Sequence, residues 1–67
     1  MSKIAKVVIR GEDRYVSSIW YAEHDVIGDC STSDWKAAAS SISEYDMPLL
    51  VAFYAEYGIE VVFEDEE

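Results

Sequence analysis

Hydrophobic and polar residues alternate in two stretches near the start of the chain. Residues 3–10 (KIAKVVIR) and 14–23 (RYVSSIWYAE) both combine β-branched or aromatic side chains with a partial period of two. Such patterns are typical of strands, and the polar, glycine-containing residues 11–13 predict a turn that joins the two strands in a hairpin. Neither face of the second strand is wholly polar. One face is expected to pack on helices, while the other keeps aromatics near water, either as an interaction surface or as the uncovered side of a small sheet.

A long apolar segment, residues 46–58 (DMPLLVAFYAEYG), has the end signals of a helix. Asp46 is a good N-cap, Pro48 falls in the first turn where its missing N–H costs nothing, and Gly58 stands where a left-handed C-cap belongs. The sequence therefore predicts a helix of about three turns.

The apolar side chains of this helix cover an arc of roughly 200° when residues are placed at about 100° intervals. That arc is wider than one face of a sheet can cover. The helix is therefore either central and flanked by other elements, or it keeps part of its surface for a partner chain. In both cases we expect Leu50 and Phe53 to be buried.

A second helix is predicted between residues 33 and 45. Hydroxyl side chains at residues 31–33 offer several N-caps, and Asp34 would lie in the first turn. The side chains expected on the buried face of this helix, on an arc of about 120°, are Trp35, Ala38, Ala39, Ile42 and Tyr45. Pro48 disfavours helical geometry at the preceding residue, so two helices separated near Asp46 are expected rather than one.

The end of the chain, residues 59–67 (IEVVFEDEE), alternates again and predicts a last strand. Its final four carboxylates, residues 64–67, are expected to form a frayed, solvated tail. Residues 24–29 are either a loop or a short third strand. The order β-β-(β)-α-α-β predicts an α+β fold for a single domain, residues 1–67, with a small antiparallel sheet and two helices packed on one face.

Charge changes the functional picture. The chain of 67 residues is 51% hydrophobic and carries a net charge of −9. Four of its five basic residues precede Tyr15, and from Tyr15 onward twelve carboxylates oppose Lys36 alone. Such a field repels nucleic acid and bilayer headgroups and attracts basic protein surfaces. The alternative is that the charge only keeps a small apolar domain in solution.

Catalytic and metal-binding patterns are not found. His24 and Cys30 are the only residues of their kinds, and nothing in the sequence places a base and an orienting group beside the thiol. Together with Asp25 and Asp29 they match no zinc or calcium loop. We expect no enzyme activity, cofactor or bound metal. A single cysteine and the lack of a signal peptide or a bilayer-spanning run predict a cytoplasmic protein.

A constellation of carboxylates and aromatics remains as the candidate binding site. Carboxylates spaced along a rigid surface can imitate backbone phosphates, and neighbouring aromatics can anchor in a partner's pockets. The candidate residues are Glu23, Asp25, Asp29, Asp34, Glu44, Asp46, Glu56, Tyr21, Trp35, Tyr45 and Tyr57. The alternative is that most of these acids are helix caps and solvated positions.

Two resemblances bear on this constellation. Residues 26–42 (VIGDCSTSDWKAAASSI) resemble the strand-turn-helix passage of HicB-type antitoxins, in which a Gly-Asp turn and a hydroxyl cap precede an alanine-containing helix. In size and acidity the chain is similar to the inhibitors of phages and mobile elements, including anti-CRISPR and nucleic-acid-mimic proteins. That similarity implies stoichiometric blocking of a basic, nucleic-acid-binding host protein. The resemblance to HicB-type antitoxins implies an antitoxin-like or regulatory domain, which could form a homodimer through its surplus apolar arc.

Overall fold

The computed structural model describes residues 2–66 and contains one sheet and one α-helix. The elements are β1 (Lys3–Ile9), β2 (Glu12–Glu23), β3 (Val26–Ser33), a short 3-10 helix η1 (Lys36–Ala38), α1 (Asp46–Ala55) and β4 (Val61–Asp65). The four strands are antiparallel in the order β3-β2-β1-β4. The α+β class and the antiparallel sheet are confirmed, but the prediction of two helices on one face is wrong.

The hairpin between β1 and β2 has a tighter turn than predicted. Ile9 pairs with Glu12, so the turn consists of Arg10 and Gly11 alone, and both have positive φ, 55° and 80°. Two central residues with positive φ define the turn type whose twist matches that of the flanking strands. Glu12 and Asp13, which were expected in the turn, therefore belong to β2.

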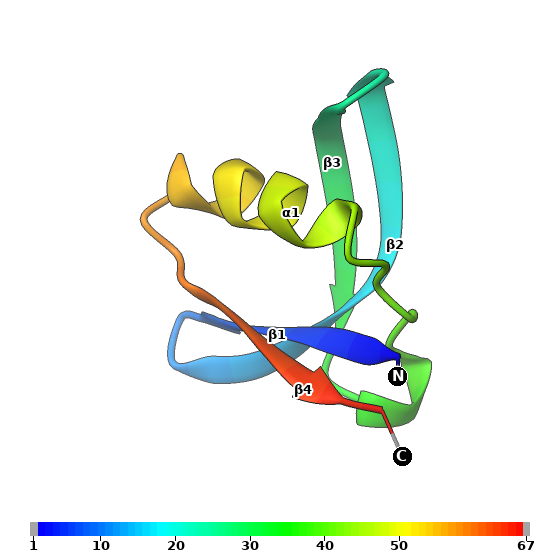
Figure 1. Cartoon of the computed structure of the whole chain (residues 1–67). Coiled ribbons are helices and arrows are strands. Elements are labelled where there is room, and N and C mark those ends of the chain that lie inside the picture. The colour runs from blue at the N-terminus through cyan, green and yellow to red at the C-terminus, as the bar shows by residue number, and fades with distance from the viewer. Residues whose placement is uncertain (1, 67) are drawn as a thin grey trace.

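The segment after β2 forms a full strand. The turn lies at residues 24–25, and β3 pairs with β2 as far as Ser33, which lengthens the predicted short strand and removes the predicted start of a helix. The register shifts between Val16 and Ser18 and again beside Tyr21, and such bulges bend a strand and increase its twist. Figure 1 shows the result: the β2–β3 hairpin rises away from β1 and β4.

The backbone of residues 39–43 fills the space where β1 and β2 diverge. The Ser40 N–H donates to the Val16 carbonyl over 3.0 Å, and the Ile42 N–H donates to the Lys3 carbonyl over 2.7 Å. The Ser40 hydroxyl donates to the Ser17 carbonyl. These strand carbonyls would otherwise lack partners, and serine readily makes such non-helical bonds. The predicted helix over residues 33–45 is therefore wrong, and only the 3-10 turn of η1 remains helical.

The start of α1 is capped by a serine that the sequence analysis did not single out. The Asp46 N–H donates to the Ser43 hydroxyl oxygen over 3.2 Å, and that hydroxyl donates to Asp46 Oδ2 over 3.1 Å. This reciprocal pair resembles a capping box. Asp46 is thus in the first turn of the helix and not its N-cap, which corrects the prediction.

The end of α1 agrees with the prediction. Gly58 has φ 72°, its N–H donates to the Ala55 carbonyl, and the Ile59 N–H donates to the Tyr54 carbonyl, both over 3.0 Å. This pair of bonds is the Schellman arrangement, which needs a left-handed residue and favours glycine there. The predicted C-cap at Gly58 is confirmed.

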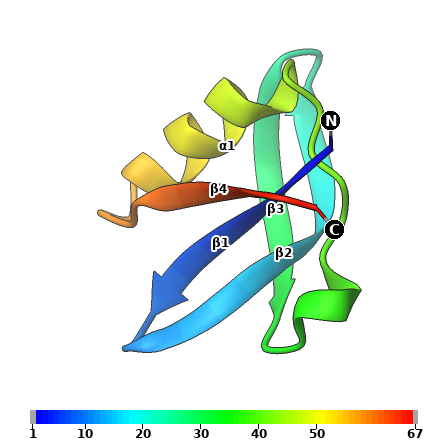
Figure 2. The same ribbon diagram turned by 60° about the horizontal axis from the view of Figure 1, so that its bottom comes forward.

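The core lies where α1 sits in the angle between the β2–β3 hairpin and the β1–β4 pair (Figures 1 and 2). Its buried side chains are Ala5, Val7, Val16, Ile27, Ile42, Leu50 and Tyr54. The prediction that Leu50 is buried is confirmed, whereas Phe53 is only half-buried. Val51 and Tyr57 are exposed, so the buried face of the helix is narrower than its apolar arc.

The acidic end of the chain is more ordered than predicted. Glu64 and Asp65 belong to β4, and the Glu66 N–H donates to the Ser2 carbonyl over 2.9 Å. Pairing with β1 and contacts with lysines hold Glu64 and Asp65, and hydrogen bonds with Ser2 and Ser41 hold Glu66, so the prediction of a frayed tail is wrong for 64–66. Residue 67, the last of the predicted tail, lies outside the described residues.

Candidate binding surface

The structure gathers four of the eleven candidate residues around one groove between β3 and α1. Asp25 lies in the β2–β3 turn, Asp29 on β3, and Glu56 and Tyr57 directly after α1. They line two neighbouring hollows of about 350 and 240 Å³, which share Phe53 and Tyr57. We call the two hollows together the β3–α1 groove.

Most of the lining of this groove is apolar. The larger hollow is lined by Val26 and Ile27 from β3 and by Leu49, Ala52 and Phe53 from α1, with Asp25 and Glu56 as its charged members. Two small residues, Ala22 and Gly28, complete its hairpin side. A Cβ at Gly28 would lie 3.0 Å from that of Ala22, so the two strands approach each other closely here.

Aromatic rings follow the helix side of the groove. The Phe53 ring centroid lies 5.0 Å from that of Tyr54, edge to face, and 5.5 Å from that of Tyr57 at a tilt of 59°. Tyr54 is buried, Phe53 is half-buried, and Tyr57 is 65% exposed. Such packing of aromatic pairs is favourable, and it places an accessible ring beside the carboxylates.

A second group of candidates lies at the start of α1. The Tyr21 hydroxyl donates to Asp46 Oδ1 over 2.6 Å, and Asp46 Oδ2 accepts from Ser43. The hydrogen bond to this carboxylate, which a phenolate would lose, raises the pKa of Tyr21 to about 12. Both Asp46 oxygens therefore serve the fold. Tyr45 and Glu44, the neighbouring candidates, are exposed.

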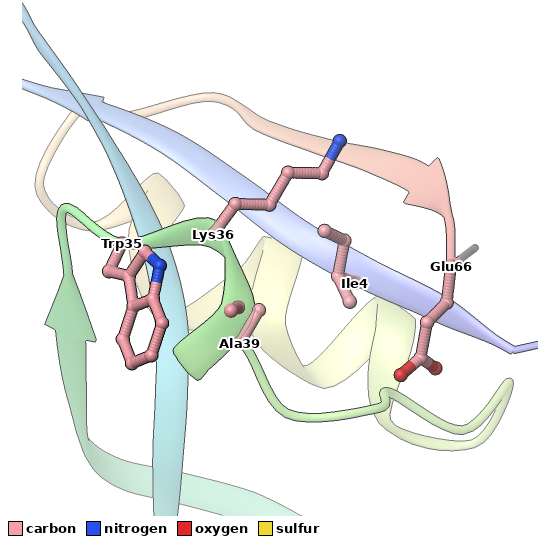
Figure 3. A pocket seen from close by; sticks show the side chains of 6 residues that line it. Ile4, Trp35, Lys36, Ala39 and Glu66 are labelled. Atoms are coloured by element: carbon pink, nitrogen blue, oxygen red, sulfur yellow. The ribbon is translucent and has the colours of Figure 1, made fainter.

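The remaining candidates lie elsewhere. Glu23 is exposed at the end of β2, and Asp34 and Trp35 precede η1. Trp35 lines a different hollow of about 520 Å³ with Ile4, Ala39, Lys36 and Glu66. Figure 3 shows Lys36 and Glu66 on opposite sides of Ile4 in this hollow. A lysine and a carboxylate here make its charge mixed, so it does not extend the acidic surface.

The three lysines are paired with carboxylates of β4, whereas Arg14 contacts Thr32, a residue that lines the smaller hollow of the groove. Lys6 Nζ and Lys36 Nζ each lie 3.4 Å from a Glu64 carboxylate oxygen, and Lys3 Nζ lies 2.6 Å from Asp65 Oδ1. Lys36 and then Lys6 lower the pKa of Glu64, and Lys3 lowers the pKa of Asp65, because each ammonium group favours the ionised carboxylate.

Arg14 is also held within the sheet. Its Nε donates to the Thr32 hydroxyl over 3.2 Å and its Nη2 to the Thr32 carbonyl over 3.0 Å. Among residues 2–66, Asp25, Asp29 and Glu56 form no ion pair within 4 Å. The carboxylates of the groove are therefore not neutralised by nearby basic side chains of the described chain.

The single histidine and cysteine occupy different settings. His24 is exposed in the β2–β3 turn, while Cys30 is half-buried on β3. Burial raises the pKa of the Cys30 thiol, which favours the unreactive protonated form. Within residues 2–66, no three His, Cys, Asp or Glu side chains are grouped so as to hold a metal ion. No helix in that part of the chain is long and apolar enough to cross a membrane.

Several groove residues were not candidates in the sequence analysis, notably Leu49, Ala52 and Phe53 on α1 and Val26 on β3. Leu49 and Phe53 lie on the wide apolar arc of the helix, which was their sequence signal, whereas Ala52 lies outside that arc and Val26 belongs to β3. Comparison of the chain with protein-family models, curated protein sequences and solved structures found no match.

Proposed function

We propose that this chain is a non-enzymatic inhibitory binding protein whose acidic surface occupies a basic, nucleic-acid-binding surface of a partner protein. The observation that carries the proposal is a set of exposed carboxylates without ion-pair partners in the described part of the chain. Three lysines are paired with carboxylates of β4, whereas Asp25, Asp29 and Glu56 have no such partner among residues 2–66. Three carboxylates free of ion pairs within the described chain are thus gathered at the β3–α1 groove.

Such a surface suits a basic partner for two physical reasons. Its field speeds the encounter with positively charged sites, and the same field disfavours direct binding of nucleic acid and anionic membranes. Carboxylates on a strand, a turn and a helix are also held at defined positions, which is what imitation of a phosphate backbone requires. Because the proposed activity is blocking by contact, it needs no cofactor, and we place it in the cytoplasm.

Competition is the direct test. Partners would be captured from a cell lysate at about 50 mM salt and released by raising salt to about 200 mM, a range over which electrostatic steering is strongly screened. We expect the purified partner to bind DNA or RNA and to release it when the protein is added. A partner that retains its nucleic acid in the presence of saturating protein would contradict the proposal.

A pair of matched variants separates the groove from overall charge. Asp25→Lys with Glu56→Lys changes the groove, while Glu12→Lys with Asp13→Lys changes net charge equally at two residues that line neither hollow of the groove. All four carboxylates are exposed, so both variants should fold, which circular dichroism would check. We expect only the groove variant to stop displacing nucleic acid. Equal loss in both variants would mean that overall charge, and not this surface, is responsible.

The exposed side of α1 supports a second candidate, a small antitoxin-like or regulatory domain that acts as a homodimer. Pro48, Val51, Ala52 and Ala55 are all exposed on this helix. An apolar helix surface of this kind is suited to contact another chain. Sedimentation equilibrium distinguishes the candidates: a concentration-dependent dimer that Val51→Lys abolishes would favour the second.

A further inference from the structure

We propose that the β3–α1 groove receives an arginine side chain of the partner protein. The inference rests on the proposed function and specifies which group of the partner is recognised. The groove offers an apolar lining, an accessible aromatic ring and unpaired carboxylates within one pair of adjoining hollows. Each of these three features matches one part of an arginine side chain.

The apolar lining matches the methylene stem. Leu49, Ala52 and Phe53 on α1 and Val26 and Ile27 on β3 line the larger hollow of about 350 Å³. Long basic side chains bury their stems along apolar surface and keep the charged head toward water. A stem seated here would cover apolar surface that no other element of the described chain covers.

The ring and the carboxylates match the head group. Tyr57 is 65% exposed and contributes to both hollows, so its ring is available to a planar cation. A guanidinium group stacks on aromatic rings and donates hydrogen bonds in a fixed fork that fits a carboxylate. Asp25 and Glu56 line the same hollow as Tyr57 and can accept those bonds.

Charge decides between this occupant and a second copy of the chain. Each copy carries a net charge of −9, so two copies repel one another. Its lysines are paired with β4 carboxylates and Arg14 is bound to Thr32, which among residues 2–66 leaves Arg10 at the β1–β2 turn as the exposed basic side chain that a second copy could offer. A lysine of the partner would satisfy the charge but not the planar stacking or the fork. Arginine is therefore the occupant that uses the whole groove.

A plugging variant tests the groove without changing charge. Ala52 is exposed and lines the larger hollow, whereas Ala55 is exposed on the same helix and lines neither hollow. Ala52→Phe should fill the groove, and Ala55→Phe is its matched control. The probe is a hexa-arginine peptide, compared with hexa-lysine, in titrations of isotope-labelled protein followed by NMR at about 50 mM salt.

We expect the amide shifts to be concentrated at residues 25–30 and 52–59, and hexa-lysine to bind more weakly than hexa-arginine. The affinity for hexa-arginine should fall about tenfold in Ala52→Phe and less than about twofold in Ala55→Phe. Equal effects of the two variants, or equal affinity for the two peptides, would overturn the groove inference. If salt-dependent binding then persisted at other carboxylates, the broader proposal of an acidic binding surface would stand. If neither peptide bound, both the groove inference and the proposal of an acidic binding surface would be contradicted.

Discussion

Arg10 is the residue whose backbone conformation fits its side chain least well. It has φ 55° at the first position of a two-residue turn whose second position is Gly11. A left-handed conformation costs an ordinary residue about 1 to 2 kcal/mol, and asparagine tolerates it better. The sequence pattern predicts that Arg10 ends a strand, because its β-branched neighbours dominate residues 3–10.

Arg10→Asn is expected to stabilise the protein by about 0.5 to 1 kcal/mol, because Asn-Gly is the preferred pair for this turn. Urea unfolding would measure the gain. Arg10→Gln is the control, since it removes the same charge without the left-handed preference, and it should give no comparable gain. An Asn variant no more stable than the Gln variant would refute the role assigned to the turn.

Leu50 is the side chain on α1 whose removal should matter most. It is fully buried in the core, whereas Phe53 is half-buried and also lines the groove. Leu50→Ala should lower the free energy of unfolding by about 2 to 5 kcal/mol through lost burial and a cavity. Val51→Ala, at a site 47% exposed, is the control and should cost much less. Equal melting midpoints for the two variants would contradict the assignment of α1 to the core.

At the scale of elements, local pattern was sufficient where one segment carries its own signals. The alternation in β1, β2 and β4 and the apolar run ending at Gly58 identified those elements. Local pattern failed over residues 33–45, where the end of β3, the 3-10 turn of η1 and an extended segment replace a predicted helix. The hydrogen bonds that decide that region join Ser40 to Val16 and Ile42 to Lys3, residues far apart in sequence, which periodicity does not detect.

The ion pairs of Glu64 connect three elements and should give stability a dependence on pH. Lys36 and Lys6 hold the pKa of Glu64 below its ordinary value of 4.5. A carboxyl with a lowered folded pKa stabilises the fold above its unfolded pKa, and this contribution disappears as pH falls through the folded pKa. The contribution of Glu64 should therefore be present near neutral pH and decline below about pH 4.5.

Unfolding midpoints of the wild type and Glu64→Gln measured across this pH range would test the dependence. The wild type should be the more stable near pH 7, and the difference should shrink as pH falls. Glu60→Gln removes the same charge from an exposed residue that forms no ion pair within residues 2–66. If the unfolding midpoints of Glu64→Gln and Glu60→Gln depended on pH in the same way, the ion pairs of Glu64 with Lys6 and Lys36 would not contribute to stability.

For the whole molecule, the candidate site was predictable in composition but not in arrangement. The sequence placed carboxylates and aromatics in one constellation, yet the fold separates Asp34 and Trp35 from the groove and commits Asp46 to a cap. It also adds Leu49 and Phe53, which the sequence placed on a wide apolar arc, and Ala52, which lies outside that arc. The grouping of these residues depends on how β3 packs against α1, and the sequence left the first part of β3 open between a loop and a short strand.

Net charge gives a last prediction at this scale, in which salt acts in opposite directions on folding and on binding. The chain carries −9 within dimensions of 29 × 28 × 15 Å, so its unpaired acids repel one another across the molecule. Screening reduces interactions beyond about 10 Å at 0.1 M salt. Raising salt from about 50 to 200 mM should therefore raise the melting temperature of the free protein while it slows association with a basic partner.

Calorimetry of the free protein and stopped-flow association with the partner would measure the two effects. The variant with Asp25→Lys and Glu56→Lys is informative for both, because it removes groove charge that contributes to repulsion and to steering. It should show a smaller rise in melting temperature and a weaker salt dependence of the on-rate. If salt instead lowered the melting temperature, the three ion pairs of Lys3, Lys6 and Lys36 would outweigh the repulsion, and the acidic surface would impose no cost on the fold.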